Sequence, residues 1–281
     1  MPGTLYVVAT PIGNLEDVTY RALRILREVS LIAAEDTRRT ARLLQHYSIS
    51  TRTTSLHEHN ERAKTPSLIA RLQAGESIAL VSDAGTPVVS DPGSQLVAAA
   101  HEAGIRVEPI PGASAVMAAV SGSGLGFGEF TFAGFPPNRS SARKKWLQTL
   151  AAEPRLLVLY EAPHRIRHTL SDMLDVFGDR RVALGRELTK AHEELVVRPI
   201  SGHLSAIKEP IGEYTLVVSP SETDSATPDV PEDAVVAIEF GELTNSMGLG
   251  RKEAMRELGK KYGLPTSHIY DTLERLKHSV D

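Results

Sequence analysis

The stretch SIALVSDAGTPVVSDPGSQLVAAAHEA, residues Ser77–Ala103, joins a strand pattern to a helix pattern through a long loop. Residues Ser77–Asp83 form an almost continuous apolar run, which is typical of a parallel strand buried on both faces. The loop Val81–Gly93 contains two aspartates, two prolines and two glycines, more than the connection of two packed elements requires. We therefore predict a βα unit whose loop binds a ligand.

Comparable units fill the first 120 residues. Expected strands at 5–10, 31–36, 53–58, 77–83 and 106–111 alternate with expected helices at 20–29, 37–47, 64–73, 94–103 and 112–120. This alternation predicts a mainly parallel sheet that is covered by helices. The glycine-rich stretch 121–128 is expected to be a hinge, and a second α/β segment follows it.

The chain is therefore expected to be an α/β protein of two consecutive α/β domains, residues 1–120 and 121–218. Residues 219–233 contain three prolines, five acidic residues and no basic ones, which is the composition of a disordered linker. Residues 234–281 contain only helix patterns, and two of these are joined by a short turn with Gly263 and Pro265. This outline predicts a small C-terminal all-helical domain of helix-turn-helix type, although two helices packed on a third would give the same pattern.

The composition excludes several classes of protein. The chain of 281 residues has no cysteine, so disulfides and thiolate metal sites are excluded. Its net charge of -4 argues against a general nucleic-acid binder, but residues 139–167 carry seven basic residues against two acidic ones. No apolar run is long enough for a membrane span, and no basic segment precedes the first apolar run. We expect a cytoplasmic protein with no membrane contact.

Polar and small residues gather after the expected strands, where open α/β sheets bind ligands. These junctions are residues 11–17, 35–38, 57–61, 81–93 and 111–115. Free carbonyls of the 81–93 loop together with Asp83 suit a ligand with hydroxyls or positive charge, and the small residues 112–115 admit a flat ring. S-adenosylmethionine (SAM) meets both conditions, whereas a sugar or an amine meets the first alone. The glycine-rich phosphate-binding fingerprints G-x-G-x-x-G and G-x-x-x-x-G-K-[ST] are absent.

The pair His57 and His59, with Glu58 between them, could be taken for a metal site, because alternate residues of a strand share one face. No third ligand with suitable spacing is evident. We therefore predict no metal.

Six stretches occur in an order and spacing that resemble a known family. They are LYVVATPIGNLEDVT, AAEDTRRT, VSDAGTPVVSDPG, PIPGASAV, YEAPHR and GRELTK. The chain resembles the ribosomal RNA small subunit methyltransferase I family, within the tetrapyrrole methylase superfamily, over nearly its whole length. The resemblance implies two α/β domains with SAM in the cleft between them, usually in a homodimer. It also implies methyl transfer to the 2'-hydroxyl of a cytidine in the decoding region of 16S ribosomal RNA, within the small ribosomal subunit.

The resemblance also implies which residues bind the cofactor. In this sequence they are Pro11, Ile12, Asp83, Pro87, Val88, Ser114, Ala115, Tyr160, Glu161 and Thr215. The basic residues expected to face RNA are Arg143, Lys144, Lys145, Arg165, Arg186 and Lys190. A solvated surface with internal ion pairs is the alternative for these basic residues.

Methyl transfer to a ribose hydroxyl needs a residue that removes a proton. The candidate bases Glu35, Asp36, His57 and Glu61 all follow expected strands, and Arg38 could bind a phosphate or orient a carboxylate. Asp36 and Thr37 could instead cap the helix that follows them. Two other functions stay open at this point: a small-molecule methylase, for example of a tetrapyrrole, and a non-catalytic, ligand-sensing DNA-binding regulator.

Overall fold

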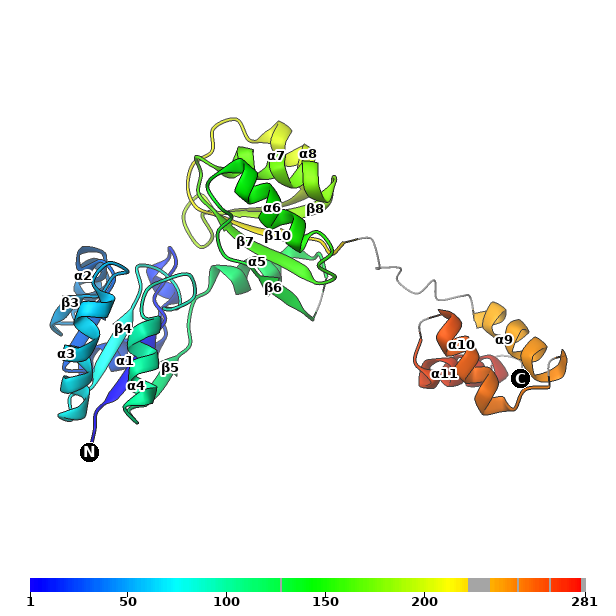
Figure 1. Ribbon diagram of the computed structural model, residues 1–281, viewed down its shortest axis with the longest axis horizontal. Coiled ribbons are helices and arrows are strands. Elements are labelled where there is room, and N and C mark those ends of the chain that lie inside the picture. The colour runs from blue at the N-terminus through cyan, green and yellow to red at the C-terminus, as the bar shows by residue number, and fades with distance from the viewer. Residues whose placement is uncertain (127, 222–232, 247, 263, 279–281) are drawn as a thin grey trace. The chain divides into compact units, whose positions relative to one another are not determined.

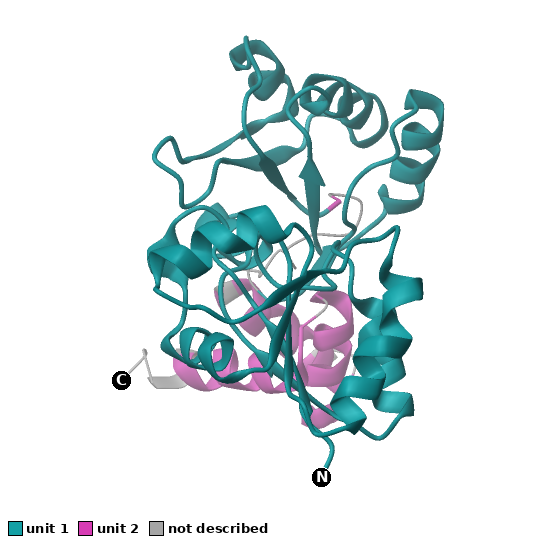
Figure 2. Ribbon diagram, turned by 90° about the vertical axis from the view of Figure 1, so that its left-hand side faces the viewer, with its two compact units in different colours: residues 1–220 teal, residues 221–281 magenta. Residues whose placement is uncertain are grey.

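The structure is a computed structural model that describes residues 1–126, 128–221, 233–246, 248–262 and 264–278. The chain forms two compact units, residues 1–220 and 221–281 (Figure 2). Unit 1 contains two sheets and unit 2 contains helices, so the expected α/β fold with a C-terminal all-helical part is confirmed (Figure 1). Most of the expected linker, residues 222–232, lies outside the described residues.

The first sheet of unit 1 is entirely parallel, with the strand order β3-β2-β4-β1-β5. Its strands are β1 (Thr4–Val8), β2 (Leu31–Ala34), β3 (Thr53–Ser55), β4 (Ile78–Val81) and β5 (Arg106–Ile110). Four helices cover it: α1 (Tyr20–Glu28), α2 (Thr37–His46), α3 (Glu61–Gln73) and α4 (Ser94–Glu102), and a short 3-10 turn, η1 (Leu15–Asp17), precedes α1.

Both faces of the first sheet are buried, as the unbroken apolar run of β4 predicts. Ala79 and Val81 pack with α1 and α2 on one face, and Ile78 and Leu80 pack with α3 and α4 on the other. Every residue of β4 is buried. Because both faces are covered, ligands can reach this sheet only at the ends of its strands.

The second sheet is mixed, with the order β6-β7-β10-β8-β9. Its strands are β6 (Phe130–Phe132), β7 (Leu156–Glu161), β8 (Arg181–Arg186), β9 (Glu194–Pro199) and β10 (Tyr214–Val218). Helices α6 (Ser140–Leu150), α7 (Ile166–Phe177) and α8 (Ile200–Ala206) cover one face. β10 runs antiparallel to both β7 and β8, which makes this half differ from the first.

Helix α5 (Ala115–Ser123) links the halves of unit 1. It follows the last strand of the first sheet, but Val116 and Ala119 pack against Val158, Ala183 and Val217 of the second. The first residues of the expected hinge, 121–123, therefore belong to this helix, which ends where Gly124 adopts a left-handed φ of 60°. The connection between the halves is thus fixed by apolar packing.

Unit 2 is a helical bundle made of α9 (Asp233–Gly241), a π-helical turn η2 (Glu242–Ser246), α10 (Arg251–Tyr262) and α11 (Thr266–His278). Val236, Met255, Leu258, Ile269 and Leu273 form its core. The helix–turn–helix pattern and the packing of two helices on a third are therefore both present. Within the described part of the chain, no helix is both long and apolar enough to cross a membrane.

Candidate functional site

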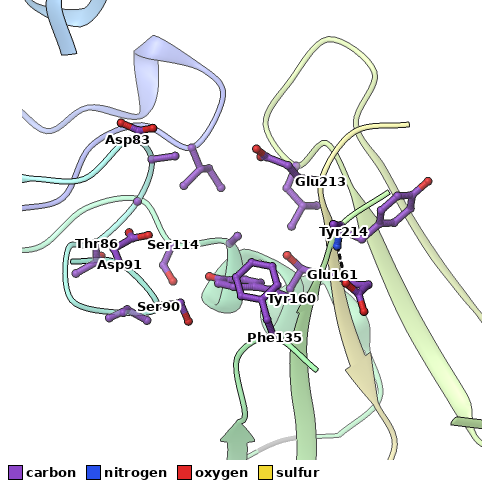
Figure 3. A pocket seen from close by; sticks show the side chains of 18 of the residues that line it. Asp83, Thr86, Ser90, Asp91, Ser114, Phe135, Tyr160, Glu161, Glu213 and Tyr214 are labelled. Atoms are coloured by element: carbon purple, nitrogen blue, oxygen red, sulfur yellow. Dashed lines mark hydrogen bonds between the residues drawn. The ribbon is translucent and has the colours of Figure 1, made fainter. Parts of the chain in front are cut away.

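A pocket of about 420 Å³ lies in unit 1, where the carboxyl ends of the first sheet meet the second half (Figure 3). Small-molecule sites have volumes of roughly 300–1,000 Å³, so the pocket is of suitable size. It is lined by Ile12, Glu35, Arg39, Asp83, Ala84, Gly85, Thr86, Val89, Ser90, Asp91, Ser114, Ala115, Phe135, Tyr160, Glu161, Ala162, Pro163, Leu188, Glu213, Tyr214 and Thr215. The structure therefore brings together segments that are far apart in the sequence.

Most residues predicted for cofactor contact lie in this lining: Ile12, Asp83, Ser114, Ala115, Tyr160, Glu161 and Thr215. Pro11, Pro87 and Val88 do not line it. Val88 instead packs near Gly93, because a Cβ built on Gly93 would be 3.3 Å from Val88 Cγ2. These three residues can support the lining but do not form it.

The loop after β4 is tied to the loop after β1. Thr10 and Gly85 exchange backbone hydrogen bonds, with N···O distances of 2.8 and 3.0 Å. Gly85 has a φ of 82°, which favours glycine and brings backbone to the pocket surface. Val88 and Ser90 also have positive φ values, 73° and 67°, although neither is a glycine. Strained backbone of this kind clusters at binding sites, and here it belongs to the loop that lines the pocket.

A second loop closes the pocket from the other half of unit 1. The turn between β8 and β9 packs on the β1 loop, because a Cβ on Gly13 would be 2.4 Å from Lys190 Cγ. The Asn14 amide donates to Thr189 Oγ1 at 3.1 Å. Leu188 of this turn lines the pocket. The motif GRELTK therefore contributes to closing the site.

Two carboxylates, Glu35 and Asp83, are held close together at the end of the first sheet. The Asp83 amide donates to Glu35 Oε2 at 3.2 Å, and the Asp36 amide donates to Asp83 Oδ1 at 2.9 Å. Arg39 Nη1 lies 3.4 Å from Asp83 Oδ2. Burial raises the pKa of Glu35, and the charge of Asp83 adds to this effect. The pocket therefore holds a carboxyl group whose proton affinity is increased.

Asp91, which the sequence did not single out, is the third carboxylate of this group. Burial raises its pKa to about 6, and the negative charges of Glu35 and Asp83 act in the same direction. Ser82 donates a hydrogen bond that partly opposes the shift. An acid with this pKa changes its protonation state just below neutral pH.

Aromatic side chains form the opposite wall of the pocket. Tyr160 makes an edge contact with Phe132 at 4.9 Å and a tilted contact with Phe135 at 5.4 Å between ring centroids. The Phe135 side chain is 53% exposed although it lines the pocket. Such a surface can stack against a flat ring.

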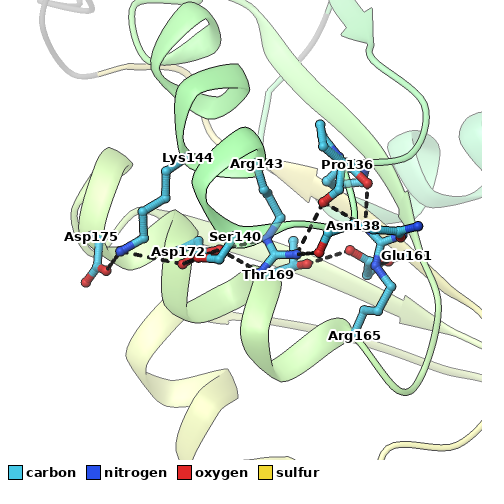
Figure 4. Close-up of polar contacts among 11 residues, drawn as sticks. Pro136, Asn138, Ser140, Arg143, Lys144, Glu161, Arg165, Thr169, Asp172 and Asp175 are labelled. Atoms are coloured by element: carbon cyan, nitrogen blue, oxygen red, sulfur yellow. Dashed lines mark hydrogen bonds and ion pairs between the residues drawn. The ribbon is translucent and has the colours of Figure 1, made fainter.

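Behind this wall a polar network fixes the segment that carries Phe135 (Figure 4). The buried Glu161 accepts from the Ala162 amide at 2.8 Å and from Thr169 Oγ1 at 2.5 Å, and lies 3.2 Å from Arg165 Nε. Arg165 also donates to the Pro136 carbonyl and to Asn138. Glu161 thus organises the wall as well as lining the pocket.

The predicted catalytic residues lie in three different surroundings. Glu35 lines the pocket. Asp36 caps α2 through the Arg38 amide at 2.8 Å and also pairs with the Arg38 guanidinium, which lowers the pKa of Asp36 to about 2. Glu61 is buried and accepts from the amides of Gln95 and Leu96, at 2.7 and 3.1 Å, so it caps α4.

His57 makes its hydrogen bonds with Asn60, three residues further along the chain. His57 Nε2 accepts from the Asn60 side-chain amide at 2.9 Å, and the His57 amide donates to Asn60 Oδ1 at 2.9 Å. Among the described residues, no group of three or more histidine, aspartate or glutamate side chains could hold a metal ion.

The basic residues predicted to face RNA are mostly ion-paired. Arg143 is buried and contacts Asp172 at 2.6 Å, and Lys144 lies 2.6 Å from Asp175 (Figure 4). The remaining pairs are Arg165 with Glu161, Arg186 with Glu194, and Lys190 with Glu187 and Glu213. Lys145 is exposed and has no ion-pair partner among the described side chains. The buried position of Arg143 does not allow direct contact with RNA.

Residues 4–202 match the family model described as "Tetrapyrrole (Corrin/Porphyrin) Methylases". A relative from Synechocystis sp., named "Ribosomal RNA small subunit methyltransferase I", is 46% identical over 273 residues, covering 95% of this chain and 96% of its own. The chain belongs to the ribosomal RNA small subunit methyltransferase I family. A relative of the same name from Pseudomonas aeruginosa is 54% identical and covers 71% of each chain.

Solved structures with the tetrapyrrole methylase fold are similar to this chain. Uroporphyrin-III-C-methyltransferase from Thermus thermophilus has a TM-score of 0.55 at 20% identity, covering 76% of this chain and 94% of its own. Diphthine synthase has a TM-score of 0.60 at 16% identity, covering 77% and 90%. At these identities the likeness establishes the fold, and the family membership rests on the relatives above.

Proposed function

We propose that the protein is a SAM-dependent methyltransferase that modifies the 2'-hydroxyl of a cytidine in the decoding region of 16S ribosomal RNA. The observation that carries the cofactor assignment is the charge of the pocket. Five carboxylates line it, from Glu35, Asp83, Asp91, Glu161 and Glu213, and one guanidinium, from Arg39. Such a lining favours a cationic ligand with hydroxyl groups and disfavours a phosphate.

The residues present fit SAM in their chemistry. Asp83 and Glu35 would accept hydrogen bonds from hydroxyl or amino groups, and the Gly85 backbone would be within reach of the ligand. Phe135 and Tyr160, opposite the small Ser114 and Ala115, would hold a flat ring. When bound, the cofactor supplies a methyl group on a positively charged sulfur, which a nucleophilic oxygen can attack.

Proton removal from the attacking hydroxyl is assigned to the carboxylates Glu35 and Asp91. Both line the pocket and have raised pKa values. A general base works best when its pKa lies near the working pH, and such a base contributes roughly 10²–10⁴-fold to the rate. Asp36 and Arg38 would stay at the edge of the site. Glu61 is not assigned a catalytic role, because its buried carboxylate caps α4.

The substrate assignment rests on the family and on the names of its members. The relatives from Synechocystis sp. and Pseudomonas aeruginosa both carry the name of a small-subunit ribosomal RNA methyltransferase. Exposed Lys145 and half-buried Lys144 on α6, with Arg165, Arg186 and Lys190, would contact RNA phosphates. Because the net charge is -4 and the basic residues are local, the protein would bind a folded particle better than free RNA. We therefore propose that it acts as a homodimer in the cytoplasm and that its substrate is the small ribosomal subunit.

A small-molecule methylase is the second candidate. It is favoured by the description of the matching family model and by the likeness of the fold to uroporphyrin-III-C-methyltransferase. Both observations concern the SAM-binding fold that RNA and tetrapyrrole methylases would share. The high identity to relatives named for ribosomal RNA favours the RNA substrate.

Calorimetric titration with SAM tests the cofactor site. Asp83→Asn removes one negative charge without changing the size of the side chain, and we expect it to weaken SAM binding about 10- to 100-fold. Glu102→Gln, at an exposed carboxylate at the end of α4, removes the same charge away from the pocket and should bind SAM like the parent protein. Equal affinity of Asp83→Asn and the parent protein would contradict the assignment.

A further inference from the structure

Unit 2 carries a groove of about 360 Å³ between α10 and α11. It is lined by Lys252, Met255, Arg256, Thr266, Ser267 and Tyr270. The lining contains two cationic side chains, two hydroxyls and one phenol, and no carboxylate. This composition is the opposite of that of the pocket in unit 1, which is rich in carboxylates.

The two cations of the groove differ from the other lysine and arginine side chains that the structure describes in unit 2. Four basic side chains of this unit are held in ion pairs: Arg251 with Glu274, Lys260 with Glu257, Lys261 with Glu239, and Arg275 with Asp233. Lys252 and Arg256 have no such partner among the described side chains. Among the described side chains of unit 2, the lysine and arginine charge that has no ion-pair partner is therefore concentrated in this groove.

The helices place these groups on one surface. Lys252 and Arg256 are four residues apart on α10, so they lie on one face of that helix, and both are exposed. Thr266 and Ser267 form the start of α11, where backbone N–H groups point outward and the helix dipole is positive. Tyr270 follows Thr266 by one turn and is 48% exposed.

Cations, hydroxyls and a helix start together suit phosphate groups, and an exposed aromatic ring suits an unstacked base. An inorganic anion would make no use of Tyr270, and an acidic protein surface would offer no base to stack on it. We infer that the groove between α10 and α11 binds single-stranded RNA, with Lys252 and Arg256 on the phosphates and Tyr270 against a base. The identity of this RNA as a part of 16S ribosomal RNA rests on the proposed function.

The test is fluorescence anisotropy of the full chain with a labelled single-stranded fragment of 16S ribosomal RNA that carries the decoding region. The double variant Lys252→Gln/Arg256→Gln should weaken binding roughly 10- to 30-fold at 0.15 M salt, since each lost phosphate contact removes about 0.7 from the slope of log affinity against log salt. Lys260→Gln is the matched control on the same helix, and its exposed ion pair should make it neutral.

Tyr270 gives an independent arm of the test. Tyr270→Ala should weaken binding roughly 5- to 100-fold, whereas Tyr270→Phe should keep the parent affinity because the ring remains. Circular dichroism checks that each variant keeps its helices. Equal losses in Lys260→Gln and the double variant, no loss in the double variant, or tighter binding of duplex DNA than of the RNA would each overturn the inference.

The experiment distinguishes failure of the proposed function from failure of the RNA-binding groove. If the proposed function is wrong and the inference is right, small ribosomal subunits will not be methylated, but RNA will still bind and its affinity will still depend on the groove residues. Failure of the inference would show as normal methyl transfer with RNA affinity that does not respond to the groove variants.

Discussion

Replacing Arg143 should damage the stability of unit 1, because this guanidinium is part of the fold. The side chains of Arg143 and Asp172 are only 4% and 9% exposed. Arg143 Nη2 and Nε lie 2.6 and 2.7 Å from Asp172 Oδ2, and Nη1 donates to the Asn138 carbonyl at 3.1 Å. Arg143→Met leaves Asp172 buried without its main partner, which typically costs about 3–5 kcal/mol of unfolding free energy.

The lower end of that range applies here. Ser140 donates to Asp172 at 3.0 Å, and Lys144 Nζ lies 3.6 Å from Asp172 Oδ1, so some compensation remains. A loss of about 3 kcal/mol corresponds to a melting temperature lower by about 6–12 °C for a unit of this size. The variant Arg143→Met/Asp172→Leu should recover at least half of the loss, because it removes the unpaired charge.

Differential scanning calorimetry of the two variants and the parent protein measures this effect, and RNA affinity is recorded on the same samples. Arg143→Met should also bind SAM more weakly, because Arg143 holds the segment that carries Phe135. A parent-like melting temperature combined with weaker RNA binding would refute the reasoning. It would show that Arg143 serves the RNA and not the fold.

Three further outcomes follow from the geometry of the site. Glu61→Ala should lower the free energy of unfolding in urea by about 2 kcal/mol, because two amides of α4 lose their acceptor, while kcat stays unchanged. A lower kcat at equal stability would show that Glu61 acts in catalysis. The kcat/KM of the parent protein should fall as the pH drops through about 6, where Asp91 becomes protonated; a pH profile of Asp91→Asn that retains this limb would assign it to another group. Phe135→Ala should raise the Kd for SAM roughly 2- to 10-fold at an unchanged melting temperature, and equal titration curves would exclude ring stacking there.

The first sheet, and the strand ends that line the pocket, could be predicted from the sequence for a physical reason. A strand buried on both faces must be apolar throughout, so β2 and β4 are visible as unbroken runs. Parallel strands also place all their carboxyl ends on one edge, which is why loops around Ile12, Asp83 and Ser114 could be assigned to one site.

Other features depend on three-dimensional contacts that no local pattern records. β9 (Glu194–Pro199) has no buried residue and α8 has only seven residues, so neither shows a strong apolar periodicity. Asp91 and Phe135 lie in loops, and only the packing of both halves of unit 1 turns them toward the pocket. The burial of Arg143 depends on Asp172, which comes from another helix.

Methyl transfer from SAM to a ribose of the small-subunit RNA can be measured directly. We would incubate the protein with methyl-labelled SAM and small ribosomal subunits that lack this modification, then locate the label by nuclease digestion and mass spectrometry. We expect label on the 2'-oxygen of a cytidine in the decoding region, and less label on naked 16S ribosomal RNA. Label on a base, or no label on either substrate while SAM still binds, would contradict it.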